Sequence, residues 1–363
     1  DRTFSSLLQG LMLEPHVIAS RTLTPELLSR PFIESSIGGG FTYGGSDMGY
    51  TTEAEVQGYN NRPFPVSFYS SLSWENVPDN RTIASNDQLD TDKRFRQGIA
   101  YVTASPTPYD RVISYFNGTR DRFSGDRLIT PTTGGAFLGE QSLATETYNA
   151  GLGWSHTVEY QNIINAALLF SASNINSRDD TIIIDGTPAL VQNDSRLSDY
   201  RERYYIAALN HTVATGDFTW RYGIEGGVSQ TRTHQSYIDW MTPGSTVSSS
   251  SSATSGLVRA YVDVLHEITP DIKAEYALFG TSISGGGTDT QRLDPRAGIA
   301  WSFADGQSLR AGFMRDGLDT TVPTLSPIGI VNLQPNQTST DESGYTDTLA
   351  VRWDAEWTPD FFT

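Results

Sequence analysis

Apolar and polar side chains take strict turns near the C-terminal end of the chain, in the sequence YTDTLAVRWDAEWTPDFF (residues 345–362). Leu349, Val351 and Trp353 fall on one parity, whereas Arg352 and Asp354 fall on the other. A period of two is the period of a β-strand, in which successive side chains point to opposite faces. The pattern therefore predicts a strand with one apolar face and one polar face.

The same alternation recurs along most of the chain after residue 31, for example over residues 66–75, 218–229, 257–267 and 293–303. Counting such segments predicts about fourteen strands, most of them near the 9–11 residues that cross a membrane in β-barrels. Residues 1–31 differ, because they contain short helical patterns, one of which starts at Thr24 followed by Pro25. We therefore predict a helical lead-in over residues 1–31 and a β-domain over residues 32–363.

The connections between these segments are of two kinds, which alternate. Short ones, such as ATGD (214–217) and ADGQ (304–307), carry the Pro, Gly, Asn and Asp residues of tight turns. Long polar ones are predicted over residues 76–94, 123–140, 176–199, 233–255 and 317–343, and the serine-rich run 248–256 is predicted to be a flexible loop tip.

Alternation of short and long connections is typical of a transmembrane β-barrel, with short periplasmic turns and long extracellular loops. Nothing in a soluble sandwich forces all long loops to one end. We therefore predict an all-β fold, a transmembrane antiparallel up-and-down β-barrel. A soluble β-sandwich, in which the apolar face would be the core, is the alternative.

Composition agrees with a barrel. Hydrophobic residues make up 37% of the chain and the mean hydropathy is −0.36, so a membrane-spanning helix is not expected. The formal net charge of −17 disfavours nucleic acid as a partner. The absence of cysteine excludes thiolate metal sites and is typical of a protein exported through the periplasm.

The sequence begins without Met or a charged signal region and ends just after a predicted turn. We therefore expect it to be a segment of a longer protein, truncated at its C-terminal end. Because single-chain bacterial barrels have even strand numbers, that protein is expected to contain sixteen or more strands.

The sequence contains no recognisable set of catalytic residues. The five histidines show no metal-ligand spacing, and no P-loop or nucleophile elbow is present. Ser155 and His156 are adjacent, so on a strand they point to opposite faces and cannot pair. We therefore predict a protein that is not an enzyme, without catalytic, cofactor-binding or metal sites.

Charged residues on the polar parity are the functional candidates. An arginine facing lipid near the midplane would cost about 2–4 kcal/mol, so this parity is expected to face the lumen. The charges could form a structural ladder of cross-strand ion pairs or line a polar path whose charges tune selectivity. The lumen-facing candidates are Arg221, Glu225, Arg259, Asp263, Glu267, Lys273, Glu275, Arg296, Arg310, Arg352, Asp354 and Glu356.

Tryptophans lie close to the predicted connections. Interfacial aromatic belts of membrane proteins would place them so, although the preference of aromatic residues for strands would also enrich them. The predicted membrane-interface aromatics are Trp74, Trp154, Trp220, Trp301 and Trp357.

Two stretches resemble known outer-membrane barrels of Gram-negative bacteria. LDPRAGIAWSFADGQSLRAGFMRD (residues 293–316) resembles the paired strands of TonB-dependent receptor barrels. Residues 348–363, together with LSPIGIVNL (residues 325–333), resemble the barrel of large tetratricopeptide-repeat outer-membrane proteins. A TonB-dependent receptor should carry a plug domain before its barrel, whereas residues 1–31 are too short for a plug and do not resemble one.

These resemblances imply an outer-membrane pore or translocation barrel that carries a polar substrate. The leading interpretation is an export or assembly barrel of a repeat-containing protein. A TonB-dependent uptake receptor and a structural barrel in a larger complex are the alternatives. The implied partners are outer-membrane lipid, a polar substrate and periplasmic proteins on the N-terminal side. The N-terminus is expected in the periplasm and the long loops outside the cell.

Overall fold

A computed structural model describes residues 31–44, 47–82, 88–129, 137–184, 190–240, 242, 244–286, 289–317, 324–334, 344–358 and 361–362. No helix among these residues is long and apolar enough to span a membrane. The helical lead-in predicted over residues 1–31 lies, except for Pro31, outside the described residues.

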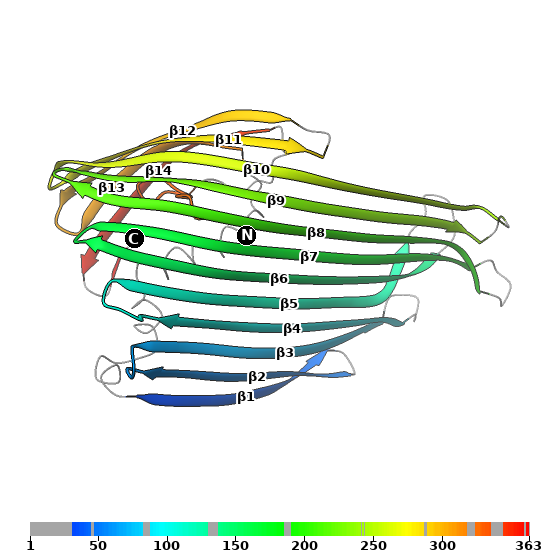
Figure 1. Ribbon diagram of the computed structural model, residues 1–363. Coiled ribbons are helices and arrows are strands. Elements are labelled where there is room, and N and C mark those ends of the chain that lie inside the picture. The colour runs from blue at the N-terminus through cyan, green and yellow to red at the C-terminus, as the bar shows by residue number, and fades with distance from the viewer. Residues whose placement is uncertain are drawn as a thin grey trace.

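One continuous sheet contains all the described strands, and their order in the sheet is their order in the sequence (Figure 1). Each strand is antiparallel to the next, which confirms the all-β, up-and-down fold and the count of about fourteen strands. β15 has only two residues. The strands are β1 (Phe32–Gly44), β2 (Asp47–Asn60), β3 (Val66–Thr82), β4 (Gln88–Ala104), β5 (Asp110–Ile129), β6 (Phe137–Glu159), β7 (Asn162–Ile184), β8 (Leu190–Thr215), β9 (Phe218–Asp239), β10 (Thr246–Thr269), β11 (Ile272–Gly285), β12 (Thr290–Ala304), β13 (Gln307–Asp316), β14 (Thr346–Thr358) and β15 (Phe361–Phe362).

The predicted short connections all lie at one end of the sheet, which we call the short-turn end. Only two residues separate β8 from β9 and β12 from β13. Gly216 and Gly306 have φ angles of 60° and 71° in these turns, a left-handed conformation that glycine adopts without steric cost. The opposite end, where the other connections lie, is the long-hairpin end.

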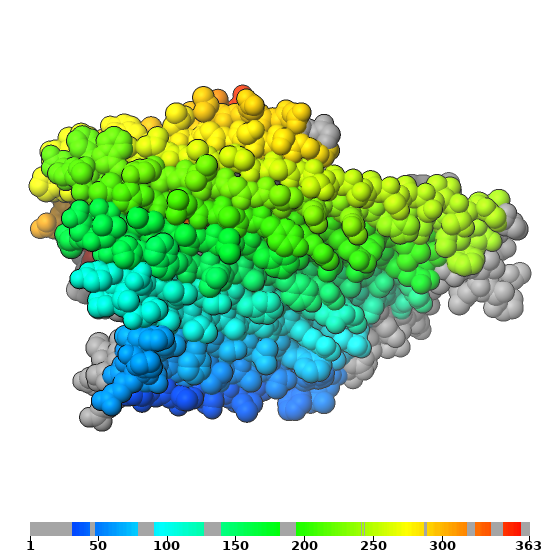
Figure 2. All heavy atoms as spheres, viewed as in Figure 1, coloured from blue at the N-terminus to red at the C-terminus, as the bar shows by residue number. Residues whose placement is uncertain are grey.

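The prediction of long loops is wrong for residues 76–94, 123–140, 176–199 and 233–255, because most of these residues extend the strands. β8 has 26 residues, and the serine-rich run predicted as a loop tip belongs to β10, where Ser248 pairs with Ser236 and Ser255 with Ser229. These extensions have polar side chains on both faces, so the apolar period that reveals a half-buried strand is absent. Backbone ladders continue the hairpins, and side-chain hydrogen bonds such as that between Ser195 and Asp180 at 2.5 Å join them. The far ends of β9 and β10 project at the right of Figure 2.

The two faces of the sheet differ as the alternation predicted. Leu349 and Val351 are 81% and 67% exposed, and large apolar side chains of the same kind cover this face, which we call the outer face. Asp263 and Glu225, on the other face, are 0% and 1% exposed. A soluble sandwich would bury its apolar face, so the soluble alternative is wrong, and an apolar exterior of this extent suits lipid. We call the opposite face the inner face.

Candidate functional site

A short piece of the connection between β13 and β14 folds against the inner face. This inner segment comprises residues 324–334, and most of its side chains are buried. Ile330 and Leu333 exchange backbone hydrogen bonds of 2.9 and 2.7 Å, and Val331 and Asn332 between them have positive φ angles. The result is a tight turn that presents apolar side chains to the wall.

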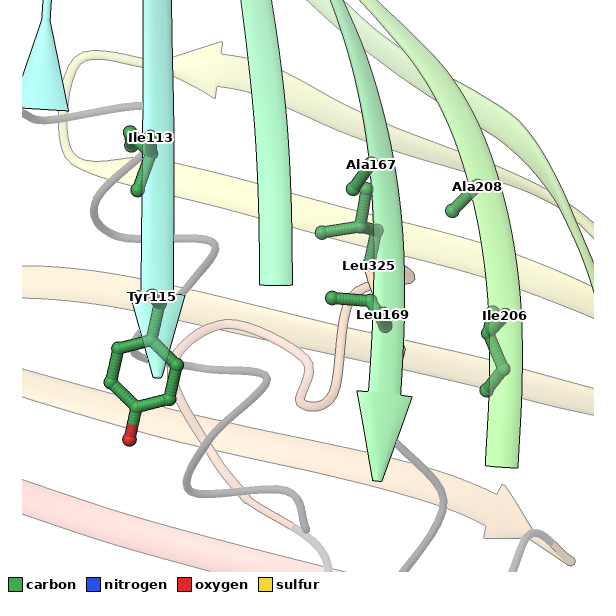
Figure 3. Close-up of a cluster of buried hydrophobic side chains, with 7 residues drawn as sticks. All are labelled: Ile113, Tyr115, Ala167, Leu169, Ile206, Ala208 and Leu325. Atoms are coloured by element: carbon green, nitrogen blue, oxygen red, sulfur yellow. The ribbon is translucent and has the colours of Figure 1, made fainter. Parts of the chain in front are cut away.

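Leu325 anchors the first half of the segment in an apolar cluster of the wall. Its side chain lies beside the strand that carries Ala167 and Leu169 (Figure 3). Ile113 of β5 and Ile206 of β8 complete the same cluster and are almost fully buried. The first half of the segment therefore covers an apolar patch of the inner face.

Two glycines of the wall lie directly beneath the second half of the inner segment. Gly298 of β12 and Gly312 of β13 are directly opposite in the ladder, on the inner face. A Cβ atom on Gly298 would lie 2.8 Å from Val331 Cγ2, and one on Gly312 would lie 2.7 Å from Ile330 Cγ2. Both distances are below van der Waals contact, so the absence of side chains at these positions lets the segment approach the wall.

Glu225 of β9 is the first polar anchor. It accepts hydrogen bonds from the Thr324 hydroxyl at 2.5 and 2.7 Å and from the Ser326 N–H at 2.5 Å. Arg259 of β10 is its direct cross-strand neighbour and donates to the Ser326 hydroxyl at 2.9 Å. A buried carboxylate with several donors and a nearby guanidinium is a satisfied site, which is what its burial requires.

Arg296 of β12 is the second polar anchor. Its Nη1 donates to the carbonyl oxygens of Pro327 at 2.7 Å and Ile328 at 2.9 Å. The guanidinium carbon lies 4.1 Å from the ring centroid of Phe279, a side chain that is 0% exposed. Stacking on this ring fixes the arginine in the orientation from which it holds the segment's backbone.

Glu275 of β11 is the third polar anchor and accepts a hydrogen bond from the Val331 N–H. It also pairs with Arg221 of β9, whose Nη2 lies 2.7 Å from Asp263 Oδ2. Six of the twelve lumen candidates therefore gather in this cradle, four in direct contact with the inner segment. Asp263 and Arg221 contact it only through Glu275.

The other six candidates lie outside the cradle. Lys273 and Glu267 pair at 2.5 Å, and Asp354 pairs with Arg352 at 2.6 Å and with Arg310 at 3.4 Å. Glu356 is exposed. Lys273 and Arg310, together with Arg221 and Glu275, line a pocket of about 570 Å³ whose other wall is residues 327–334 of the chain.

Four of the five predicted interface tryptophans have described side chains, and all four are exposed on the outer face. Trp154, Trp220 and Trp301 lie near the short-turn end, and Trp74 lies toward the long-hairpin end. The side chain of Trp357 is outside the described residues. Their placement at a membrane interface stays a prediction.

Asp110, the first residue of β5, joins several side chains at the short-turn end. Its carboxylate accepts hydrogen bonds from the Thr107 hydroxyl at 2.6 Å and from Trp154 Nε1 at 3.0 Å, and lies 2.8 Å from His156 Nδ1. Because the Thr107 hydroxyl, then His156, stabilise the charged form, the pKa of Asp110 lies below its ordinary value.

Sequence reasoning missed the residues of the inner segment itself and the wall residues that orient its anchors. No sequence pattern marked Thr324 and Ser326, because they lie in a connection without a motif. Phe279 was not marked either, because aromatic residues are common in strands. The sole available signal was the apolar stretch 325–333, which interrupts a polar connection. Within the described ranges, no three His, Cys, Asp or Glu side chains gather as a metal-ligand set.

No protein-family model matches the sequence, and no curated protein matches it significantly. Several solved structures match in shape at low sequence identity. The siderophore receptor PiuA from Acinetobacter baumannii has a TM-score of 0.57 at 10% identity, with 91% of this chain and 55% of that one covered. BauA, the ferric preacinetobactin receptor from the same species, gives 0.57 at 10% identity, covering 90% and 52%.

The ferripyoverdine receptor of the outer membrane of Pseudomonas aeruginosa gives a TM-score of 0.57 at 9% identity, covering 80% of this chain and 42% of that one. The chain thus spans about half the length of the receptors it matches. At such identities the likeness concerns the fold alone, and it agrees with the sheet and its apolar exterior. The fold of this chain is that of an outer-membrane β-barrel.

Proposed function

We propose that this chain forms the wall of an outer-membrane channel for a polar solute, and that the inner segment is the constriction of that channel. The observation that carries the proposal is the cradle, in which three polar anchors and two glycines hold residues 324–334 on the inner face. A purely structural barrel has no need of a segment held on its inner face by buried charges. The proposal includes no enzymatic step.

Charge beside the segment supports a polar substrate. The pocket there is lined by Arg221, Lys273 and Arg310 together with the buried Glu275, so a solute would meet charged groups of both signs. Rings of charged side chains tune selectivity in pores of this kind. The chemical identity of the solute is not part of the proposal.

The likeness to receptor barrels supports uptake as the direction of transport. The resemblance of residues 325–333 and 348–363 to repeat-protein barrels instead supports export, which stays a prediction. A binding assay on the full-length protein with purified periplasmic TonB domain separates the two. Binding favours uptake, and the lack of it together with periplasmic partners bound through the N-terminal side favours export.

The first experiment displaces the constriction. Gly312→Val places side-chain atoms where Ile330 packs, so in planar bilayers the full-length variant should conduct more than the wild type. Gly226→Val is the matched control, because a Cβ there has its nearest neighbour at 4.0 Å, on the outer face. Equal conductance of the three proteins would contradict a constriction at this position.

The second experiment fixes the constriction in place. The chain has no cysteine, so the double variant Gly298→Cys with Val331→Cys introduces one disulfide at a point of close approach. If passage requires the segment to move, the oxidised variant should transport solute more slowly than the reduced one. Reductant should restore the rate. If oxidation forms the bond and the rate does not change, the segment is a fixed lining rather than a moving constriction.

A further inference from the structure

Arginines face one another across neighbouring strands on the outer face, toward the long-hairpin end. Arg94 is directly opposite Arg122 and Arg96 is directly opposite Arg120 on β4 and β5. On β8 and β9, Arg201 is directly opposite Arg232. Like charges directly opposite each other in an antiparallel ladder are destabilising, so three such pairs need a counter-charge.

The three pairs lie in two adjacent rows that run across the sheet from β4 to β9. Following the ladder, one row contains Arg96, Arg120, Glu146, Asn174, Arg201 and Arg232, and the other contains Arg94, Arg122, Ala144, Asn176, Asp199 and His234. Six arginines thus meet two carboxylates, in a chain whose net charge is −17.

Carboxylates match only part of this charge. Glu146 pairs with Arg120 at 2.8 Å, Asp199 with Arg201 at 2.9 Å, and Asp92, two residues before Arg94, with Arg94 at 2.6 Å. Arg96 instead lies over the ring of Trp74 at 4.2 Å. Within the described residues, Arg122 and Arg232 are exposed and have no carboxylate at ion-pair distance.

The rows mark the border of the apolar outer surface. On β9 the outer side chains from Trp220 to Val228 are apolar or glycine, a length of nine residues, and Arg232 follows four residues later. Nine residues match the span of a transmembrane strand. The arginines therefore lie at the level where the head groups of one lipid leaflet begin.

A groove opens beside the arginines, on their apolar side. It has a volume of about 440 Å³ and is lined by Arg96 and Arg120 together with Leu72, Phe116 and the glycines Gly98 and Gly118. A Cβ on either glycine would come within 3.2 Å of a neighbouring side chain, so small residues here keep the groove open. Charge at one end and apolar walls below are complementary to an amphiphile with an anionic head.

We propose that the arginine rows bind the phosphate groups of a phosphorylated lipid in the leaflet at the long-hairpin end, with part of its acyl region in the groove. Guanidinium groups bind phosphate in a bidentate manner, and the head groups supply the counter-charge that Arg122 and Arg232 lack. This site is on the outer face and is independent of the inner segment and of transport.

The experiment compares the thermal unfolding of full-length wild type and the double variant Arg96→Gln with Arg232→Gln, purified in a neutral detergent. Without lipid the variant should be at least as stable as the wild type, because like-charge repulsion has been removed. Added lipid A should raise the unfolding temperature of the wild type, and zwitterionic phosphatidylcholine should not. The variant should bind lipid A about thirtyfold more weakly, as expected for the loss of two arginines at an anionic surface.

Controls separate this proposal from rival sources of the effect. Arg352→Gln, which removes an exposed arginine of the inner face, should respond to lipid A as the wild type does. Equal stabilisation of wild type and double variant by lipid A would overturn the proposal. A soluble glucosamine phosphate that stabilises the wild type as much as lipid A would overturn the assignment to a lipid. If the double variant does not fold, salt serves instead. In 0.5 M NaCl the Debye length is about 4 Å, so exposed charges farther apart than this are largely screened. Such salt should stabilise the lipid-free wild type and weaken its binding of lipid A.

Discussion

The backbone N–H of Ser326 donates a hydrogen bond of 2.5 Å to Oε1 of Glu225, although the two residues are 101 positions apart in the chain. The same carboxylate receives the hydroxyl of Thr324. One side chain of β9 thus fixes the entry of the inner segment, and its removal tests how firmly the segment is held.

Glu225→Ala should loosen the inner segment without disturbing the barrel wall. It removes the carboxylate that accepts from the Ser326 N–H and the Thr324 hydroxyl, which then keep only weaker neutral partners such as each other, at a cost of about 1–3 kcal/mol. A cysteine placed at Gln334 should then react faster with a water-soluble thiol reagent than in the wild-type background. Glu356→Ala, at an exposed carboxylate, should leave that rate unchanged.

Val351→Arg should impair insertion into the membrane. Val351 is on the outer face, and an arginine near the lipid midplane costs about 2–4 kcal/mol. The fraction of protein that becomes heat-modifiable on a gel after folding into lipid vesicles measures this. The neighbouring change Arg352→Ala should fold normally and alter ion selectivity in a bilayer recording. The reverse outcome would mean that the assigned facing is one residue out of register.

Backbone amides over residues 248–255 should show alternating protection from hydrogen exchange. In this part of β10 the described partner is β9, because pairing with β11 begins only at Ser255. Every second N–H therefore points to a neighbour, and the others point away from it. Exchange measured residue by residue should follow this period of two. Uniformly fast exchange would mean that residues 248–255 form a loop and not a paired strand.

Acid should lower the stability of the fold by protonating Asp110 at the short-turn end. The folded-state pKa of this carboxyl lies below its ordinary value, so its stabilising contribution is complete above the unfolded-state pKa and is lost as pH falls through the folded-state value. Unfolding followed from about pH 5 to pH 2 should therefore be less pH-dependent in Asp110→Asn than in the wild type. Thr107→Ala, which removes the first donor, should change the profile in the same direction.

The sequence predicted the fold in outline because each wall strand meets two environments, and the alternation of Leu349, Arg352 and their neighbours records both. It failed beyond the apolar band, since residues such as Ser248 have water on both sides and pair through their backbones alone. It placed Glu225 and Arg296 on the face that bears the cradle, yet could not find Thr324 or Ser326. Their importance comes from contact between distant parts of the chain, which no local pattern encodes.

The unequal strand lengths have a consequence for access. β8 has 26 residues and β13 has 10, a difference of roughly 50 Å along the strand direction at about 3.3 Å per residue. Among the described strands, the β6 to β10 part of the sheet therefore extends farther at the long-hairpin end than β13 does. A large particle that approaches the protein from the side of β6 to β10 meets these polar hairpins before it meets the apolar outer face.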